Sequence, residues 1–332
     1  MQLPLPRTTT LTSHPFGLEW MPDGTLYLDW LDSGTVKVQS TIWRLANQAH
    51  QWEQLRAINQ HCNNPTLQRI AGTADKLGLA CIIGVKNSQV EVGAFLYDLP
   101  TATIGPLFAS YQPPQGGYIW NVQRQEGLVS GGNIFSTLQW LTPQGTVPVT
   151  LTLQNSGNIW HLPESVTAEA QAETSQAYYQ RYSQASPVGE TGSMDWAWKT
   201  DQIAFWATLA PIGRAYSLLE RVSWNLYILD RHTMTAQSIF TSDSDGGSVR
   251  WSPDGEWLAY DISGKWPFQS AGLYLWSTRT GKTYRVYNGN ISAFAWAPSQ
   301  QDIATIIASS ETEYELWKFD VRSIINSDGA GT

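Results

Sequence analysis

Basic residues are few in this chain, whose 332 residues include 20 Lys and Arg against 28 Asp and Glu, a formal net charge of −8. A surface that binds the phosphate backbone of nucleic acid concentrates basic side chains, so this balance argues against a nucleic-acid partner. Long apolar runs are missing as well, and residues 79–85 form one of the longest. Because a transmembrane helix needs about 20 apolar residues, no membrane span is expected.

Cysteine is also scarce, and two residues, Cys62 and Cys81, are too few for a disulfide framework. Cys62 follows polar residues in a predicted loop, whereas Cys81 lies inside an apolar run, and the sequence leaves open whether they are bridged. The first residues have neither the basic region nor the apolar core of a secretion signal. We therefore expect a periplasmic or exported protein if a signal has been removed, and a cytoplasmic one otherwise.

Motifs that carry catalysis are missing too. The sequence has no His-x-His, His-Glu-x-x-His, Cys-x-x-Cys or Gly-x-Ser-x-Gly, and its five histidines are scattered. An acidic turn with Asp243 and Asp245 resembles the start of a calcium loop but has no distal glutamate at the required spacing, so a solvated turn is the alternative. The sequence predicts no cofactor and no catalytic residue.

What the chain does have is an internal repeat. The clearest copy is Val-Arg-Trp-Ser-Pro-Asp-Gly-Glu-Trp-Leu-Ala-Tyr at 249–260, and degraded copies occur at 18–28, 195–205 and 294–305. Each copy has two alternating apolar runs around a turn. Pro-Asp-Gly favours such a turn because Pro fixes φ, Asp bonds its own backbone and Gly accepts a positive φ. Each copy therefore predicts a β-hairpin.

A third strand follows each hairpin, as in Leu-Tyr-Leu-Trp at 273–276, and several lead into a polar turn and a fourth strand. The third strands recur at intervals of 52, 44, 88, 47 and 43 residues. A four-stranded unit of about 45 residues, repeated, is the signature of a β-propeller blade. We predict an all-β, six-bladed β-propeller with blades at about 17–62, 66–112, 116–154, 191–242, 246–289 and 290–325.

The repeat supports a named resemblance. Trp-Ser-Pro-Asp-Gly at 251–255, with Leu-Ala-Tyr at 258–260, resembles the repeat of TolB-like propellers, a branch of the WD-repeat-like group. The resemblance covers roughly residues 16–154 and 191–325. It implies a six-bladed propeller that binds or scaffolds other proteins, often in the bacterial periplasm. The chain has no room for the additional N-terminal domain of TolB, so TolB's own role is not carried over.

Two features lie outside the blades of this single domain, which we expect to span residues 1–332. Residues 7–12 alternate and are rich in Thr, and we predict that they supply the outer strand of the last blade and close the ring. The 88-residue interval contains an insertion at 155–190, between blades three and four. Its Ala, Glu and Gln predict a helix near 164–184, with a degenerate seventh blade as the alternative.

The function predicted from this pattern is a non-catalytic scaffold that binds a protein or peptide, as a monomeric propeller in a bacterial envelope or assembly complex. The alternative is an enzyme or carbohydrate-binding propeller with its site in the central funnel. Asp195 is the one acidic residue that the sequence places near an innermost strand. Three or more convergent His, Asp or Glu side chains in the funnel would favour the alternative.

Blade topology also predicts where a partner binds. Loops between second and third strands leave a blade on the same face as the connections to the next blade. The insertion and the long connections at 208–223 and 261–271 therefore share a face. They are rich in Tyr, Trp and Arg, the types enriched at binding hot spots. The predicted partner-binding residues are Trp160, His161, Tyr178, Tyr179, Arg181, Tyr182, Arg214, Tyr216, Arg221, Trp266 and Phe268.

Overall fold

A computed structural model gives the arrangement of the chain. It describes residues 1–6, 13–33, 38–46, 51–86, 89–107, 118–130, 138–149, 188–197, 199–209, 224–242, 246–262, 271–310 and 313–329. Within these ranges no helix is both long enough and apolar enough to span a membrane.

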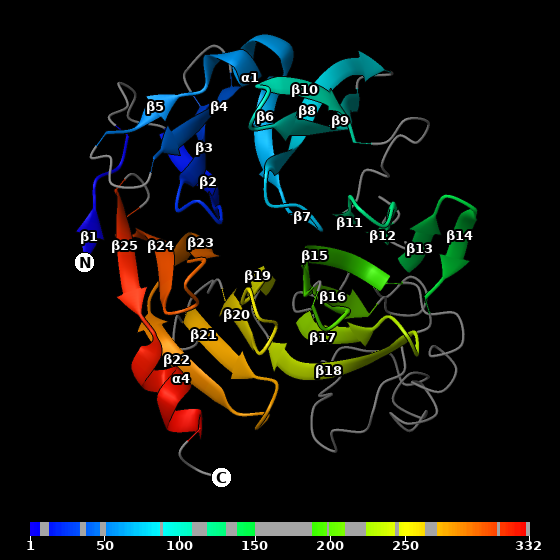
Figure 1. Cartoon of the computed structure of the whole chain (residues 1–332), viewed down its shortest axis with the longest axis vertical. Helices are drawn as coiled ribbons and strands as arrows, with labels where there is room; N and C mark the ends of the chain where they lie inside the picture. The colour runs from blue at the N-terminus through cyan, green and yellow to red at the C-terminus, as the bar shows by residue number, and fades with distance from the viewer. Residues whose placement is uncertain are drawn as a thin grey trace, which may run out of the picture.

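The described strands form six sheets arranged in a ring, the six blades of a β-propeller (Figure 1). Blade one contains β2 (Ser13–Trp20), β3 (Leu26–Ser33), β4 (Val38–Leu45) and β5 (Glu53–Gln54). Blade two contains β6 (Asn63–Gln68), β8 (Lys76–Lys86), β9 (Gln89–Asp98) and β10 (Thr103–Pro106). Blade three contains β11 (Tyr118–Asn121), β12 (Glu126–Ser130), β13 (Leu138–Thr142) and β14 (Gly145–Pro148), with β7 (Ile70–Ala71) added in parallel to β11.

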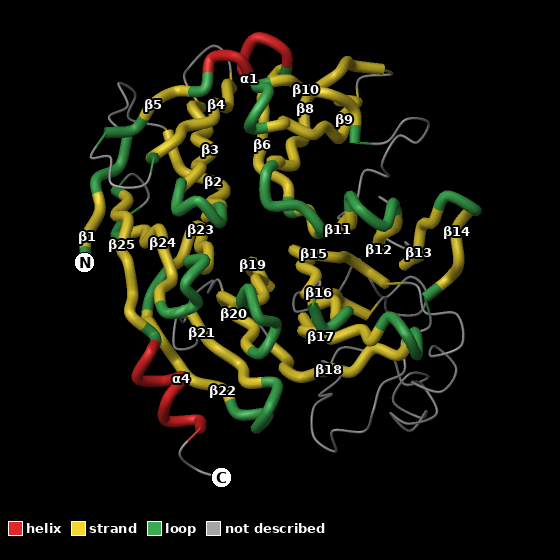
Figure 2. Tube along the Cα trace, viewed as in Figure 1, coloured by secondary structure: helices red, strands yellow, loops and turns green. Residues whose placement is uncertain are grey.

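Blade four contains β15 (Val188–Ala197), β16 (Gln202–Leu209), β17 (Trp224–Asp230) and β18 (Thr235–Ser242). Blade five contains β19 (Gly246–Trp251), β20 (Trp257–Ile262), β21 (Gly272–Ser277) and β22 (Thr283–Asn288). Blade six contains β23 (Ile291–Trp296), β24 (Asp302–Ala308), β25 (Tyr314–Asp320) and β1 (Gln2–Leu3). In the part of the chain drawn in colour in Figure 2, the helices are α1 (Arg56–His61) and α4 (Arg322–Gly329).

Inner strands of neighbouring blades are in contact around the ring, and β23 of blade six contacts β2 of blade one. Between blades two and three the contact is made by β7, which follows β6 and pairs with β11. The ring is therefore complete with six blades, which confirms the predicted architecture over the seven-bladed alternative. The insertion predicted at 155–190 lies outside the described residues up to residue 187, and so does its predicted helix at 164–184. Residues 188–190 already belong to β15.

An N-terminal strand closes the ring, as predicted, but it is not the predicted segment. The strand β1 pairs with β25, with Gln2 opposite Trp317 and Leu3 opposite Leu316. Residues 7–12 lie outside the described residues, and the edge assigned to them is occupied by residues 2–3. The physical reason is packing, because Leu3 and Leu5 cover the apolar cluster shared by blades six and one. The burial gained there outweighs the β propensity of the threonine run, on which the prediction for residues 7–12 depended.

Cys62 and Cys81 form a disulfide with a Cα–Cα distance of 5.2 Å. Cys62 lies in the connection between α1 and β6, where it caps the helix, and its side chain is buried although its sequence neighbours are polar. Cys81 lies on β8, as its apolar neighbours suggested. The bridge ties the connection between blades one and two to the second strand of blade two.

The repeat turns form as the Pro-Asp-Gly pattern predicts. Gly24 and Gly255 have φ of 85° and 78°, where a side chain would be strained. Asp23 and Asp254 each accept a backbone N–H two residues on, at 2.8 and 3.0 Å. The two strands joined by each turn thereby keep the register that buries the repeat tryptophans.

Trp251, Trp257 and Trp296 are core residues, as their recurrence suggested, with exposed fractions of 3%, 4% and 5%. Trp257 packs in the cluster that joins blades five and six. Its substitution Trp257→Ala should lower the free energy of unfolding by about 3–5 kcal/mol, because it loses buried apolar area and leaves a cavity. Chemical denaturation measures this loss, and Trp43→Ala, at a half-buried tryptophan, is the matched control with a smaller expected loss.

Two buried carboxyl groups lie where the inner strand bulges. Asp29 accepts the backbone N–H of Leu67 at 2.8 Å and so joins blade one to blade two. Asp261 of β20 accepts the backbone N–H of Ser248. A Cβ on Gly247 would lie 2.2 Å from the Asp261 carboxylate, so only glycine fits at that bulge. Burial raises the pKa of Asp29 to about 6 and that of Asp261 to about 7, although backbone N–H groups oppose the shift.

These two groups predict a pH dependence of stability. Their carboxyls bind protons more tightly in the folded chain than in the unfolded one, so the free energy of unfolding should fall as pH rises from about 4 to about 7. We expect a difference of a few kcal/mol between pH 5 and pH 8, measured by urea denaturation. The double variant Asp29→Asn, Asp261→Asn should flatten the dependence, whatever its absolute stability. A wild-type stability that rises over this range would contradict the prediction.

Candidate functional site

The partner-binding residues predicted from the sequence lie outside the described residues, from Trp160 to Phe268, and so do Asp243 and Asp245. Their grouping on one face therefore stays a prediction. Among the residues that the structure does describe, no three His, Cys, Asp or Glu side chains come close enough to hold a metal ion.

The described structure has a cavity of about 420 Å³ at the ring axis. Its walls come from the ends of inner strands and from the turns that join first and second strands, and all six blades contribute. Leu209 and Trp224, which flank residues 210–223, lie at the end of blade four that is remote from the cavity. The register of β16 and β17 shows this, because Thr208 pairs with Trp224, whereas Gln202, beside the turn between β15 and β16, pairs with Asp230. The cavity therefore opens on the face opposite the one predicted to bind a partner.

Tryptophans lie at the end of three inner strands, or next to the end in β15, and line the cavity. Trp196, Trp251 and Trp296 are at most 5% exposed, and Trp20 is half-buried. Trp296 donates its indole N–H to the backbone carbonyl of Arg250 at 3.0 Å, which joins blade six to blade five. The rings of Trp196, Trp251 and Trp296 are therefore largely buried and leave the cavity little aromatic surface. The apolar rim is completed by Met21, Pro22, Pro253 and Pro298.

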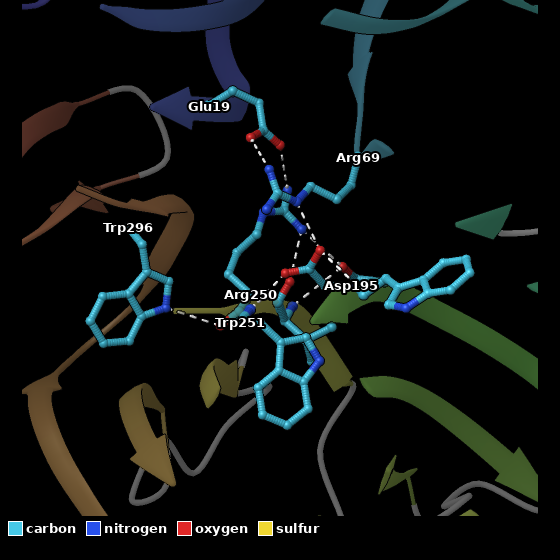
Figure 3. Close-up of polar contacts among 9 residues, drawn as sticks. Glu19, Arg69, Asp195, Arg250, Trp251 and Trp296 are labelled. Carbon is cyan, nitrogen blue, oxygen red and sulfur yellow. Dashed lines mark hydrogen bonds and ion pairs between the residues drawn. The ribbon is translucent and has the colours of Figure 1, made fainter. Parts of the chain in front are cut away.

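Four charged side chains meet beneath this rim, and we call them the axial quartet: Glu19, Arg69, Asp195 and Arg250 (Figure 3). They come from blades one, two, four and five. Arg69 donates to Glu19 at 2.9 Å and to Asp195 at 2.8 Å, while Arg250 lies 3.6 Å from Glu19. Figure 3 shows both guanidinium groups reaching toward the same Glu19 carboxylate.

Asp195 is the most enclosed member of the axial quartet, with no exposed surface. Besides Arg69, it accepts the backbone N–H groups of Trp196 at 2.9 Å and Trp251 at 2.6 Å. Its carboxylate therefore fixes the junction between blades four and five. The burial of Arg69 disfavours its charge, but Asp195 and Glu19 outweigh that cost and raise its pKa.

The sequence identified Asp195 but missed its partners. Glu19 and Arg250 each stand directly before the repeat tryptophan, as Asp195 does, so aligning the copies would have found both. Arg69 gives no such signal, because it is the single residue between β6 and β7, where the chain leaves blade two to pair with blade three.

The axial quartet predicts a large difference between two arginines. Arg69→Gln should cost about 3–5 kcal/mol of unfolding free energy, because Asp195 is left buried without its cation. Arg44→Gln is the matched control, since the pair of Arg44 with Glu53 is 41% and 66% exposed and should contribute less than about 1 kcal/mol. Equal losses in the two variants, measured by chemical denaturation, would refute the structural role of Arg69.

Comparison with known proteins supports the fold alone. No family model and no curated protein matches the sequence. Among solved structures, an oligogalacturonate lyase in complex with manganese has a TM-score of 0.54 at 11% identity, over 96% of this chain and 93% of that one. TolB from Acinetobacter baumannii has a TM-score of 0.47 at 11% identity, over 94% of this chain and 64% of that one. The propeller domain of the trilobed protease from Pyrococcus furiosus has a TM-score of 0.47 at 12% identity, over 93% of this chain and 96% of that one. The likeness to the lyase shows a β-propeller, and the resemblance to the TolB-like family stays a prediction.

Proposed function

We propose that this protein is a non-catalytic binding propeller that holds a segment of a partner protein in the mouth of the axial cavity. The observation that carries the proposal is the cavity itself, a concave space of about 420 Å³ with an apolar rim over a polar floor. Ligand sites commonly combine apolar walls with a few fixed polar groups. A volume of this size suits a few side chains of a peptide.

The state of the carboxylates favours binding over catalysis. A general acid or base must be able to exchange a proton with a substrate. Both oxygens of Asp195 already accept hydrogen bonds from Arg69 or from backbone N–H groups, and Glu19 is held by Arg69. We therefore assign these groups to the support of the cavity.

The tryptophans favour a peptide over a sugar. Carbohydrate recognition uses an exposed aromatic face on which a sugar ring can stack. Trp196, Trp251 and Trp296 are nearly buried and leave little ring surface on which a sugar could stack. Pro22, Pro253 and Pro298 instead form a rigid apolar rim against which bulky side chains can pack.

The disulfide bears on the compartment. Structural disulfides persist mainly in oxidising compartments such as the periplasm. The Cys62–Cys81 bridge therefore supports the exported branch of our expectation, and with it a role in a bacterial envelope complex. The insertion at 155–190 remains a second proposed surface.

A random linear peptide library displayed on phage tests the proposal. We expect peptides selected on the wild-type protein to bind at least about tenfold more weakly to Gln123→Trp, because Gln123 is exposed at the cavity and a ring there would fill it. Fluorescence anisotropy of labelled peptides measures the affinities.

Gln144→Trp is the matched control, because Gln144 is also exposed in a turn of blade three but does not line the cavity. It should leave the affinities unchanged. The proposal fails if no peptide is enriched, or if the selected peptides bind Gln123→Trp as well as wild type.

A further inference from the structure

Arg250 is the member of the axial quartet whose charge is least compensated. Its Nη1 donates to the backbone carbonyl of Val249 at 2.8 Å and to Ser193 Oγ at 3.4 Å. Its Nη2 lies 3.6 Å from Glu19 Oε1, beyond hydrogen-bond distance, and its Nε has no hydrogen-bond partner. The side chain is only 15% exposed, so water satisfies little of this deficit. A buried cation in this state is costly unless something completes it.

The contrast with Arg69 shows how the negative charge is divided. Arg69 holds both carboxylates at hydrogen-bond distance, and Asp195 is in addition occupied by two backbone N–H groups. Glu19 Oε1, the oxygen nearest Arg250, makes no hydrogen bond. Two arginines thus share two carboxylates unequally: the quartet is formally neutral, but Arg250 has only the longer contact of 3.6 Å to Glu19.

The accessible surface of the cavity floor is cationic although the chain is acidic. The side chains of Arg69 and Arg250 are 32% and 15% exposed, against 8% for Glu19 and none for Asp195. The charged groups that a ligand can reach on the floor are therefore mainly the two guanidinium groups.

We infer that the cavity binds a carboxylate of the partner segment, with Arg250 as its principal contact; this inference rests on the proposed function. A carboxylate accepts from a guanidinium in a charge-assisted hydrogen bond and would complete the loose pairing of the Arg250 guanidinium, whose Nη2 lies 3.6 Å from Glu19. Because the quartet is formally neutral, it can take up one negative charge at less cost than two, which favours a carboxylate over a doubly charged phosphate. The apolar rim selects a bulky apolar residue next to it in the peptide.

Two sources can supply this carboxylate, an acidic side chain or the C-terminus of the partner chain, and the experiment separates them. The library is panned once with its peptides fused through their C-termini and once with free C-termini. Selected peptides are then synthesised in matched pairs, Asp or Glu against Asn or Gln, and free C-terminus against amide. Enrichment of acidic residues in the first panning assigns the side chain, and dependence on the free terminus in the second assigns the chain end.

We expect removal of the carboxylate to weaken binding to wild type at least about tenfold, the size of one charge-assisted bond. In Arg250→Gln the acid and amide peptides should bind within about twofold of each other, and Arg250→Lys should restore part of the preference. The comparison of peptide pairs on wild type needs no variant, so it decides the matter even if Arg250→Gln does not fold.

Peptides that bind wild type, lose affinity for Gln123→Trp and show no preference for a carboxylate would overturn this inference while the proposed function stands. A preference that persists in folded Arg250→Gln would overturn the role of Arg250. If the panning enriches no peptide at all, the proposed function fails and the inference fails with it.

Discussion

The hydrogen bonds of Arg69 to Glu19 and Asp195 are the constraint on which the centre of the ring depends. They join residues that are 50 and 126 positions apart and that belong to three different blades. Replacing such a buried pair with apolar residues can leave stability unchanged, but charges demand defined geometry where apolar side chains tolerate many packings. The axial quartet therefore fixes how the inner strands stand relative to one another, and the shape of the cavity above it follows from that arrangement.

Ring closure imposes the second constraint, and both chain ends serve it. The N-terminus adds β1 to blade six, with the terminal ammonium donating to the carbonyl of Lys318 at 3.0 Å. At the other end α4 follows β25 and returns to blade five, where buried Asp328 accepts from Ser277, Thr280, Tyr284 and Arg279. Burial opposes the charge of Asp328, but these donors outweigh it and hold its pKa well below the ordinary value. The pairing of β1 with β25 covers the outer edge of blade six and closes the ring, so no free sheet edge is left there.

The sequence predicts the blades well because their information is local. Alternating apolar residues and the Pro-Asp-Gly turn at 22–24 act within a dozen positions, and repetition strengthens the pattern. The closing strand was misplaced because two residues, Gln2 and Leu3, carry too little periodicity to stand out. The helix α4 was missed for a similar reason, since its docking depends on Asp328 and on donors some 50 residues away. The partners of Asp195 are also distant in the sequence. Only an alignment of the repeat copies, in which Glu19 and Arg250 occupy the position of Asp195, could have identified these two.

The site owes its binding potential to the turns that surround it. Backbone hydrogen bonds of 2.9–3.1 Å close the turns of blades one, three, four, five and six, from Met21 to Gln300. A rim built of closed turns and prolines loses little conformational freedom when a ligand arrives, so more of the contact energy becomes affinity. The same rigidity prevents the inner strands from shifting to bring Glu19 closer to Arg250, because Glu19 is held by Arg69 and Arg250 by the carbonyl of Val249. The loose pairing of Arg250 with Glu19 is therefore a permanent feature of the floor, and a group from outside can strengthen it.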